Sequence, residues 1–121
     1  MKKILIAEDD KFLASAYRLK LIKAGFEIQI ASNGVEIFEI LETFIPDIIL
    51  LDLVMPVMDG FIALTKIKLI PKYQNIPVIV ASNLGQKDDI DRAKGLGAAD
   101  FIVKSDLSLD SLITKINGTI K

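Results

Sequence analysis

The sequence contains neither cysteine nor histidine. Without cysteine the chain has no disulfide, no thiolate metal site and no thiol nucleophile. Without histidine it has no imidazole ligand for zinc, no catalytic triad and no phosphohistidine of its own. Any metal bound by these 121 residues must therefore be held by oxygen atoms, which favours Mg²⁺, Ca²⁺ or Mn²⁺.

A strong net charge and long apolar runs are missing as well. Fifteen basic and sixteen acidic residues leave a formal net charge of -1, so no general attraction to nucleic acid or to an anionic membrane is expected. The apolar run after Met1-Lys2-Lys3 is too short for a secretory signal, and no run is long enough to span a membrane. We therefore expect a cytoplasmic protein that contacts neither nucleic acid nor membrane directly.

What is present is a globular composition and a regular alternation of patterns. Hydrophobic residues make up 51% of the chain and charged residues 26%, which predicts one domain covering residues 1–121. Continuous apolar runs at 4–7, 48–51 and 78–81 predict strands that are buried on both faces. The alternating segment 26–30 predicts an edge strand, and 101–103 predicts a short fifth strand that ends at Lys104.

Helical patterns lie between these strands. Asn33 is a predicted N-cap with Glu36 as the return half of a capping box, and Asp59 and Ser108 are further predicted starts. The fourth helix runs through 89–93 and ends at Gly95 or Gly97, and Gly25 closes the first. The predicted apolar helix positions are Leu13, Tyr17, Leu21 and Ala24, then Ile37, Phe38 and Leu41, then Phe61, Leu64 and Ile67, and finally Leu112, Ile113 and Ile116.

Five β-α units in succession predict an α/β fold, with a doubly wound parallel sheet and right-handed crossovers. If strands two and five are the edges, the order 2-1-3-4-5 of flavodoxin-like folds fits the burial pattern. Strands one and three are then neighbours at the switch point of the sheet, where ligands bind outside the carboxyl ends of the strands.

Polar side chains converge on that end of the predicted sheet. Glu8 and Asp9 follow the first strand, and Asp52 follows the third in very apolar surroundings, where a carboxylate is costly unless a cation or strong donors meet it. Ser82 ends the fourth strand and Lys104 the fifth. A nucleophile, a site for a divalent cation, a lysine and a hydroxyl are the groups that phosphoryl transfer to a carboxylate requires.

Four segments resemble the receiver domains of two-component response regulators. They are Ile4-Leu5-Ile6-Ala7-Glu8-Asp9-Asp10, Leu50-Leu51-Asp52-Leu53-Val54-Met55-Pro56-Val57-Met58-Asp59-Gly60, Ala81-Ser82-Asn83 and Gly97-Ala98-Ala99-Asp100-Phe101-Ile102-Val103-Lys104. They occur in the order and at the spacing of that family and cover nearly the whole chain.

The resemblance implies a role for each matching position. Asp52 corresponds to the phosphoacceptor. Asp9, Asp52 and the main-chain carbonyl of Val54 correspond to the ligands of Mg²⁺, for which Mn²⁺ is a possible substitute, and Glu8 acts through water. Ser82 and Lys104 correspond to the groups that bind the phosphoryl oxygens, and Ser82 and Phe101 to the switch. The resemblance assigns Asp10 no role, so a helix cap is expected.

The resemblance also implies partners. The phosphoryl donor would be a sensor histidine kinase or a phosphotransfer protein, and the protein target would bind the face of the fourth helix, fifth strand and fifth helix. Phe101 lacks the hydroxyl of a tyrosine, so it would contribute packing alone. Such a domain catalyses only its own phosphorylation and slow dephosphorylation. It is a monomer or dimerises on activation.

The sequence departs from the family pattern after Lys104, where Ser105 replaces the usual proline. We predict a trans Lys104–Ser105 bond, because a cis bond to a residue other than proline costs about 3 kcal/mol. Val54 and Leu84 occupy the positions that influence hydrolysis of the acyl phosphate in the family, and neither can orient a water. We therefore expect slow loss of the phosphoryl group.

Three other classes of function remain open. A phosphatase of the haloacid dehalogenase type would need a second aspartate where Val54 stands. A pseudo-receiver would bind a partner without becoming phosphorylated, although the complete set of acids, hydroxyl and lysine argues against it. A flavodoxin-type cofactor binder would need a phosphate-binding loop after the first strand, where the acids stand.

Overall fold

The computed structural model describes residues 1–83, 86–106 and 108–120. Five parallel strands form one sheet in the order β2-β1-β3-β4-β5, as predicted. The strands are β1 (Lys3–Ala7), β2 (Glu27–Ala31), β3 (Ile48–Leu51), β4 (Val78–Ser82) and β5 (Asp100–Val103). The helices are α1 (Lys11–Lys23), α2 (Gly34–Leu41), α3 (Gly60–Leu69), α4 (Lys87–Gly95) and α5 (Leu109–Ile120), with a 3₁₀ turn η1 (Lys104–Asp106) after β5.

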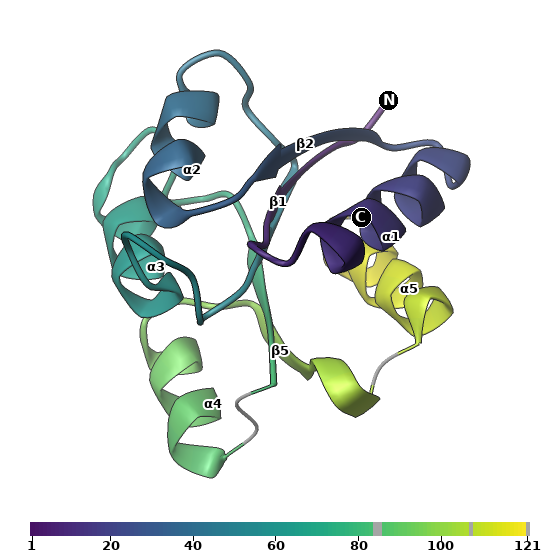
Figure 1. Cartoon of the computed structure of the whole chain (residues 1–121). Coiled ribbons are helices and arrows are strands. Elements are labelled where there is room, and N and C mark those ends of the chain that lie inside the picture. The colour runs from purple at the N-terminus through teal and green to yellow at the C-terminus, as the bar shows by residue number, and fades with distance from the viewer. Residues whose placement is uncertain (84–85, 107, 121) are drawn as a thin grey trace.

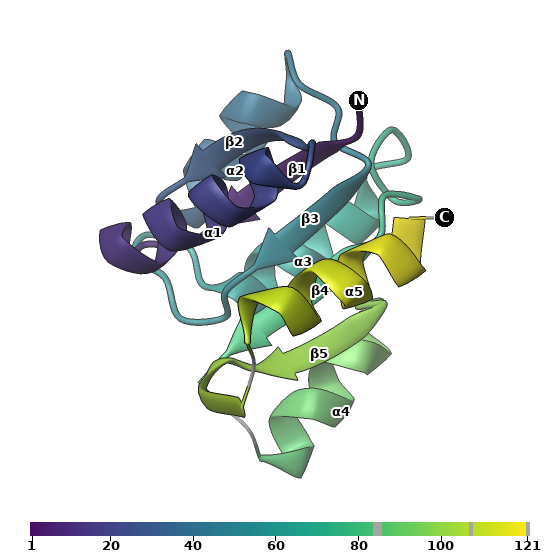
Figure 2. The same cartoon turned by 90° about the vertical axis from the view of Figure 1, so that its right-hand side faces the viewer.

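The helices cover both faces of the sheet. Helices α1 and α5 lie on one face, and α2, α3 and α4 lie on the other (Figure 1). Figure 2 shows α1 and α5 in front of the sheet. Successive side chains of a strand point to opposite faces, so β1 sends Leu5 into the core under α2 and α3 and Ile4 into the core under α1 and α5. This arrangement explains why β1, β3 and β4 are apolar at nearly every position.

The edge strand β2 has the predicted alternation, with Glu27 and Gln29 exposed and Ile28 and Ile30 half-buried. It begins one residue later than predicted, because Phe26 is buried just before the strand and Ala31 completes the pairing with Ala7. Strand β4 extends to Ser82, and β5 ends at Val103, one residue before Lys104.

Most predicted helix ends are confirmed. Asp10 caps α1 by accepting hydrogen bonds from the N–H groups of Phe12 and Leu13, and Asp59 caps α3 through Ile62. Ser108 Oγ accepts a hydrogen bond from the N–H of Ser111 at 3.1 Å, just before α5. Helix α4 ends at Gly95.

Two details of the helix predictions are wrong. Asn33 caps α2, but the Glu36 carboxylate accepts hydrogen bonds from the N–H and hydroxyl groups of Ser32, so the capping box closes one residue earlier than predicted. Ala24 lies outside the core, because it is the exposed C-cap of α1, where the chain turns towards β2. The other predicted apolar helix positions are buried or pack against the two core clusters.

Candidate functional site

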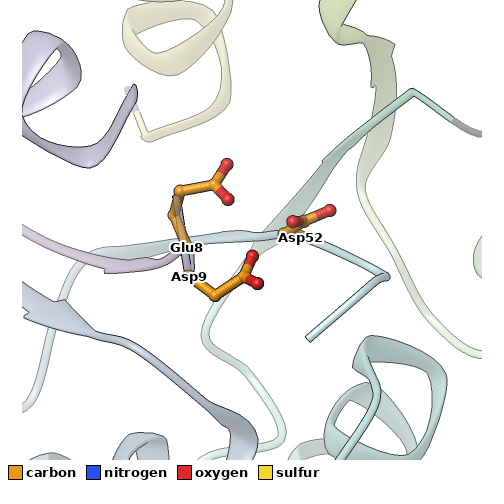
Figure 3. A group of neighbouring side chains, drawn as sticks. All are labelled: Glu8, Asp9 and Asp52. Atoms are coloured by element: carbon orange, nitrogen blue, oxygen red, sulfur yellow. The ribbon is translucent and has the colours of Figure 1, made fainter. Parts of the chain in front are cut away.

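The pairing of β1 with β3 brings three acidic side chains together at the carboxyl end of the sheet. Ala7 pairs with Leu51 in the last position of the ladder, and the N–H of Asp52 donates to the carbonyl of Ala7 at 3.0 Å. Glu8, Asp9 and Asp52 each offer a carboxylate oxygen, and these oxygens all lie within 4.8 Å of one another. Figure 3 shows Glu8 and Asp9 projecting from the end of β1, with the Asp9 carboxylate directed towards Asp52.

The three acids differ in exposure. Glu8 is 3% exposed and Asp52 is 6% exposed, whereas Asp9 is exposed. Burial of two neighbouring carboxylates is expensive unless a cation or hydrogen-bond donors compensate their charge. The buried pair therefore requires a counter-charge within the site.

Lys104 supplies that counter-charge. Its Nζ lies 3.2 Å from Asp52 Oδ2 and donates a hydrogen bond to Glu8 Oε1. Burial lowers the pKa of Lys104, but the hydrogen bond to Glu8 and the charge of Asp52 outweigh this effect, so the pKa is raised overall. Lys104 is thus a permanent cation between two acids from different strands.

Glu8 is the acid whose protonation responds most to this environment. Burial raises the pKa of the Glu8 carboxyl from 4.5 to about 7; the Lys104 hydrogen bond opposes the increase and the charge of Asp52 adds to it. Burial is thus a larger cause of the raised pKa at Glu8 than the charge of the neighbouring Asp52.

These groups line a cavity of about 410 Å³. Its walls include all the predicted metal and phosphoryl-binding residues. Among them, Val54 is 59% exposed, whereas Ser82 at the end of β4 is almost fully buried. Asp10 and Asn83 also line it, and neither was predicted as a site residue. The sequence could have indicated both residues, because Asp10 follows Asp9 and Asn83 follows Ser82 at the ends of two central strands.

Phe101 is the one predicted site residue outside the cavity wall. It is half-buried in β5, where it pairs with Val80 and packs against the core under α2, α3 and α4. A switch role for Phe101 would therefore act through core packing beside the cavity. The Lys104–Ser105 bond is trans as predicted, since the described residues contain no cis peptide bond.

The donor set fits a hard divalent cation. Mg²⁺ prefers oxygen ligands and is usually held by one or two carboxylates while it keeps several waters. Two carboxylates beside an open cavity, with a third close by, provide such a set, and no nitrogen or sulfur ligand is available from histidine or cysteine. The residues present therefore fit Mg²⁺ or Mn²⁺.

Comparison with known proteins identifies the family. Residues 4–117 match the model of the response regulator receiver domain, and the chain belongs to that family. It is 37% identical over 119 residues to the chemotaxis protein CheY of Bacillus subtilis, covering 98% of this chain and 97% of that protein. It is also 37% identical to a protein-glutamate methylesterase/protein-glutamine glutaminase of Rhodospirillum rubrum, over 99% of this chain but 32% of that protein.

A solved structure gives the same fold. The Mn²⁺-bound form of the response regulator Rcp1 superposes with a TM-score of 0.84 at 28% identity, covering 98% of this chain and 91% of that one. The chain spans 33% to 50% of the length of several other curated relatives, among them transcriptional regulators.

Receiver domains are signalling modules that bind Mg²⁺ through acidic residues and interact with histidine kinases and downstream effectors. The cluster of Glu8, Asp9 and Asp52 is consistent with the phosphoacceptor site of such a domain. Within the described part of the chain, no helix is both long enough and apolar enough to cross a membrane.

Proposed function

We propose that residues 1–121 form a single receiver domain that takes a phosphoryl group on Asp52 and switches a protein-interaction surface. One observation carries the proposal: the buried Asp52 carboxylate shares an open cavity with three further acids and the ammonium group of Lys104. This arrangement supplies a nucleophile together with cationic compensation for the charge of an incoming phosphate.

We assign Asp9, Asp52 and the main-chain carbonyl of Val54 as the metal ligands, with Glu8 acting through water. The bound Mg²⁺ would offset the charge of the acids and of the phosphoryl oxygens. Mn²⁺ is a possible substitute, which the Mn²⁺-bound form of the related Rcp1 supports. The neighbouring positions of all three carboxylates are the structural basis of this assignment.

The phosphoryl group would come from an external donor, and groups of this chain would receive it while the proposed Mg²⁺ offsets charge. An Asp52 oxygen forms a bond to phosphorus as the phosphorus–nitrogen bond of a donor phosphohistidine breaks, and the electron pair stays on the imidazole nitrogen. Lys104 Nζ already lies next to Asp52 and can pair with a phosphoryl oxygen. Ser82 at the cavity wall can donate its hydroxyl to a second oxygen.

The output would be a change in the face of α4, β5 and α5. Ser82 would follow the phosphoryl group and Phe101 would repack behind it. Ala93 is the one buried residue of α4. The Arg92 guanidinium lies 4.0 Å from the centre of the Phe61 ring on α3. In the described contacts, few side chains therefore anchor α4 to the rest of the domain. A weakly anchored helix suits a surface that changes between two states.

The proposed partners are a sensor histidine kinase or a phosphotransfer protein as the donor and a protein target at the switching face. Three further points stay predictions. They are a monomer or an activation-dependent dimer, a cytoplasmic location, and no direct contact with nucleic acid or membrane. Because Val54 stands where a haloacid dehalogenase-type phosphatase needs its second aspartate, turnover of a phosphate ester is not part of the proposal.

The deciding experiment is incubation with acetyl phosphate and Mg²⁺ followed by intact mass measurement. The wild type should gain one phosphoryl group and Asp52→Asn should gain none. Asp59→Asn is a matched control, since Asp59 is an exposed helix cap that asparagine can replace, and it should be labelled like the wild type. A wild type that binds Mg²⁺ but takes up no phosphoryl group would instead be a pseudo-receiver.

A further inference from the structure

The segment between β3 and α3 is fixed at both ends. Asp52 is held to β1 by its backbone hydrogen bond to Ala7, and the N–H of Gly60 donates to the carbonyl of Leu53 at 2.8 Å. A Cβ on Gly60 would overlap the carbonyl of Asp52 and would lie 2.5 Å from Leu53 Cα, so α3 begins directly against the backbone of the acidic site. Residues 54–59 therefore form a closed loop above that site.

The middle of this loop is strained. The N–H of Met58 donates to the carbonyl of Pro56 at 2.7 Å, which closes a three-residue γ-turn centred on Val57. Val57 has a φ of 70°, a left-handed conformation that a β-branched residue adopts at a cost. Such a conformation persists only where surrounding contacts hold it.

Gly34, the first residue of α2, provides such a contact. A Cβ at Gly34 would lie 2.6 Å from Met58 Cβ and 2.7 Å from the Met58 carbonyl oxygen. Side-chain and main-chain atoms of the loop thus reach α2 at a distance that only glycine permits. In Figure 1 the loop lies just below α2.

We propose that Gly34 is a positioning residue for the metal site, acting by holding the loop that carries Val54. The inference rests on the proposed function, since it concerns the Val54 carbonyl as a Mg²⁺ ligand. Val54 lines the acidic cavity, and the chain from Val54 to Met58 is only five residues long, so a displacement at Met58 reaches Val54. Gly34 contacts no ligand; it acts through Met58.

The variant Gly34→Ala tests this role. Met58 also lines an apolar hollow of about 450 Å³ between α2 and α3, so the loop has room to shift and the variant is expected to fold. Groups that orient metal ligands from outside change metal affinity by about 10–100-fold when they are altered, so we expect Mg²⁺ affinity to fall about tenfold. Isothermal titration calorimetry gives the affinity directly, without reference to phosphorylation.

Gly118→Ala is the matched control. Gly118 lies within α5, and a Cβ there would meet no atom within 4 Å, so this variant should bind Mg²⁺ like the wild type. The chain has three methionines, so methyl-labelled methionine gives few NMR signals, and the Met58 signal should move in Gly34→Ala and stay in Gly118→Ala.

A second pair of variants approaches the contact from the loop. Met58→Gly removes the Cβ that packs on Gly34 and should weaken Mg²⁺ binding, whereas Met58→Ala keeps that Cβ and should not. Met58 is half-buried, so neither change should prevent folding. This pair decides the question if Gly34→Ala does not fold.

The outcomes separate the two proposals. If the wild type does not bind Mg²⁺, the proposed function fails. If the wild type binds Mg²⁺ and both Gly34→Ala and Met58→Gly bind it with unchanged affinity, the proposed function stands and the positioning role is overturned. A displaced Met58 signal with unchanged affinity would likewise overturn it, because the contact would then be packing alone.

Discussion

Lys104 Nζ lies 3.2 Å from Asp52 Oδ2, so the cation that follows β5 neutralises the acid that follows β3. Strand β4 separates these two strands in the sheet, and Lys104 reaches past its end to contact Glu8 as well. Lys104, Glu8 and Asp52 are distant in the sequence, and the contacts of the lysine join them into one charged group.

Replacing Lys104 by methionine should destabilise the protein in the absence of metal. Removal of one partner of a buried ion pair leaves an uncompensated charge, which costs about 3–5 kcal/mol. Mg²⁺ should restore part of this loss by compensating the same acids. Urea unfolding with EDTA and with Mg²⁺ measures both effects.

Lys115→Met is the control for that experiment. Lys115 pairs with Asp100 at 3.0 Å on the surface, and such exposed pairs contribute at most about 1 kcal/mol. If Lys104→Met lost no more stability than Lys115→Met, the buried pair would not have the energetic role assigned to it.

The metal-free protein should lose stability as the pH rises. The pKa of Glu8 is about 7 in the folded state and 4.5 is its ordinary value, so between these values the folded state keeps a proton that the unfolded state has released. Stability should therefore fall with a slope approaching about 1.4 kcal/mol per pH unit in that window and level off above it.

The comparison with Glu8→Gln isolates this titration. Lys104 belongs to the site, and the charges of the site act on the nearby Tyr17 in the core. Both side chains have a raised pKa, so Lys104 stays charged and Tyr17 stays neutral throughout that window. Denaturation curves in EDTA should show a flatter pH dependence for Glu8→Gln than for the wild type. Parallel curves for the two proteins would contradict the raised pKa of Glu8.

Asp10 lines the acidic cavity, but its contacts indicate a helix cap. Its Oδ1 accepts hydrogen bonds from Phe12 at 3.0 Å and Leu13 at 3.1 Å. Asp10→Ala should cost about 1 kcal/mol of stability, and Asp10→Asn should retain most of it because asparagine is an equally good cap. Thermal unfolding measures the stability. A large loss of Mg²⁺ affinity in Asp10→Asn would show instead that the carboxylate serves the metal site.

The phosphorylated protein should lose its phosphoryl group slowly, because Val54 offers no hydrogen-bonding side chain at the cavity rim. Val54 is 59% exposed and lines the cavity, so an amide there could orient water. Val54→Asn should shorten the lifetime of the acyl phosphate, whereas Val54→Ala should not. The decay of the phosphorylated mass after removal of the donor gives both rates. Leu84, the other residue expected to matter, lies outside the described residues.

The amino-acid sequence by itself determined the strand order and the end of the sheet where the site forms. Apolar runs such as 48–51 and helix caps such as Asp59 are local patterns that follow from burial and backbone hydrogen bonding. The sequence also placed Glu8, Asp9, Asp52, Ser82 and Lys104 at one edge, because parallel strands end on the same side.

Only the tertiary structure decided which of these groups contact one another. Two contacts depend on how elements far apart in the chain pack: that of Lys104 with both Glu8 and Asp52, and that of Met58 with Gly34. The closure of the capping box on Ser32 depends on a local shift of one residue. A periodic pattern indicates which face a residue takes, whereas contacts at 3 Å depend on how separate elements pack.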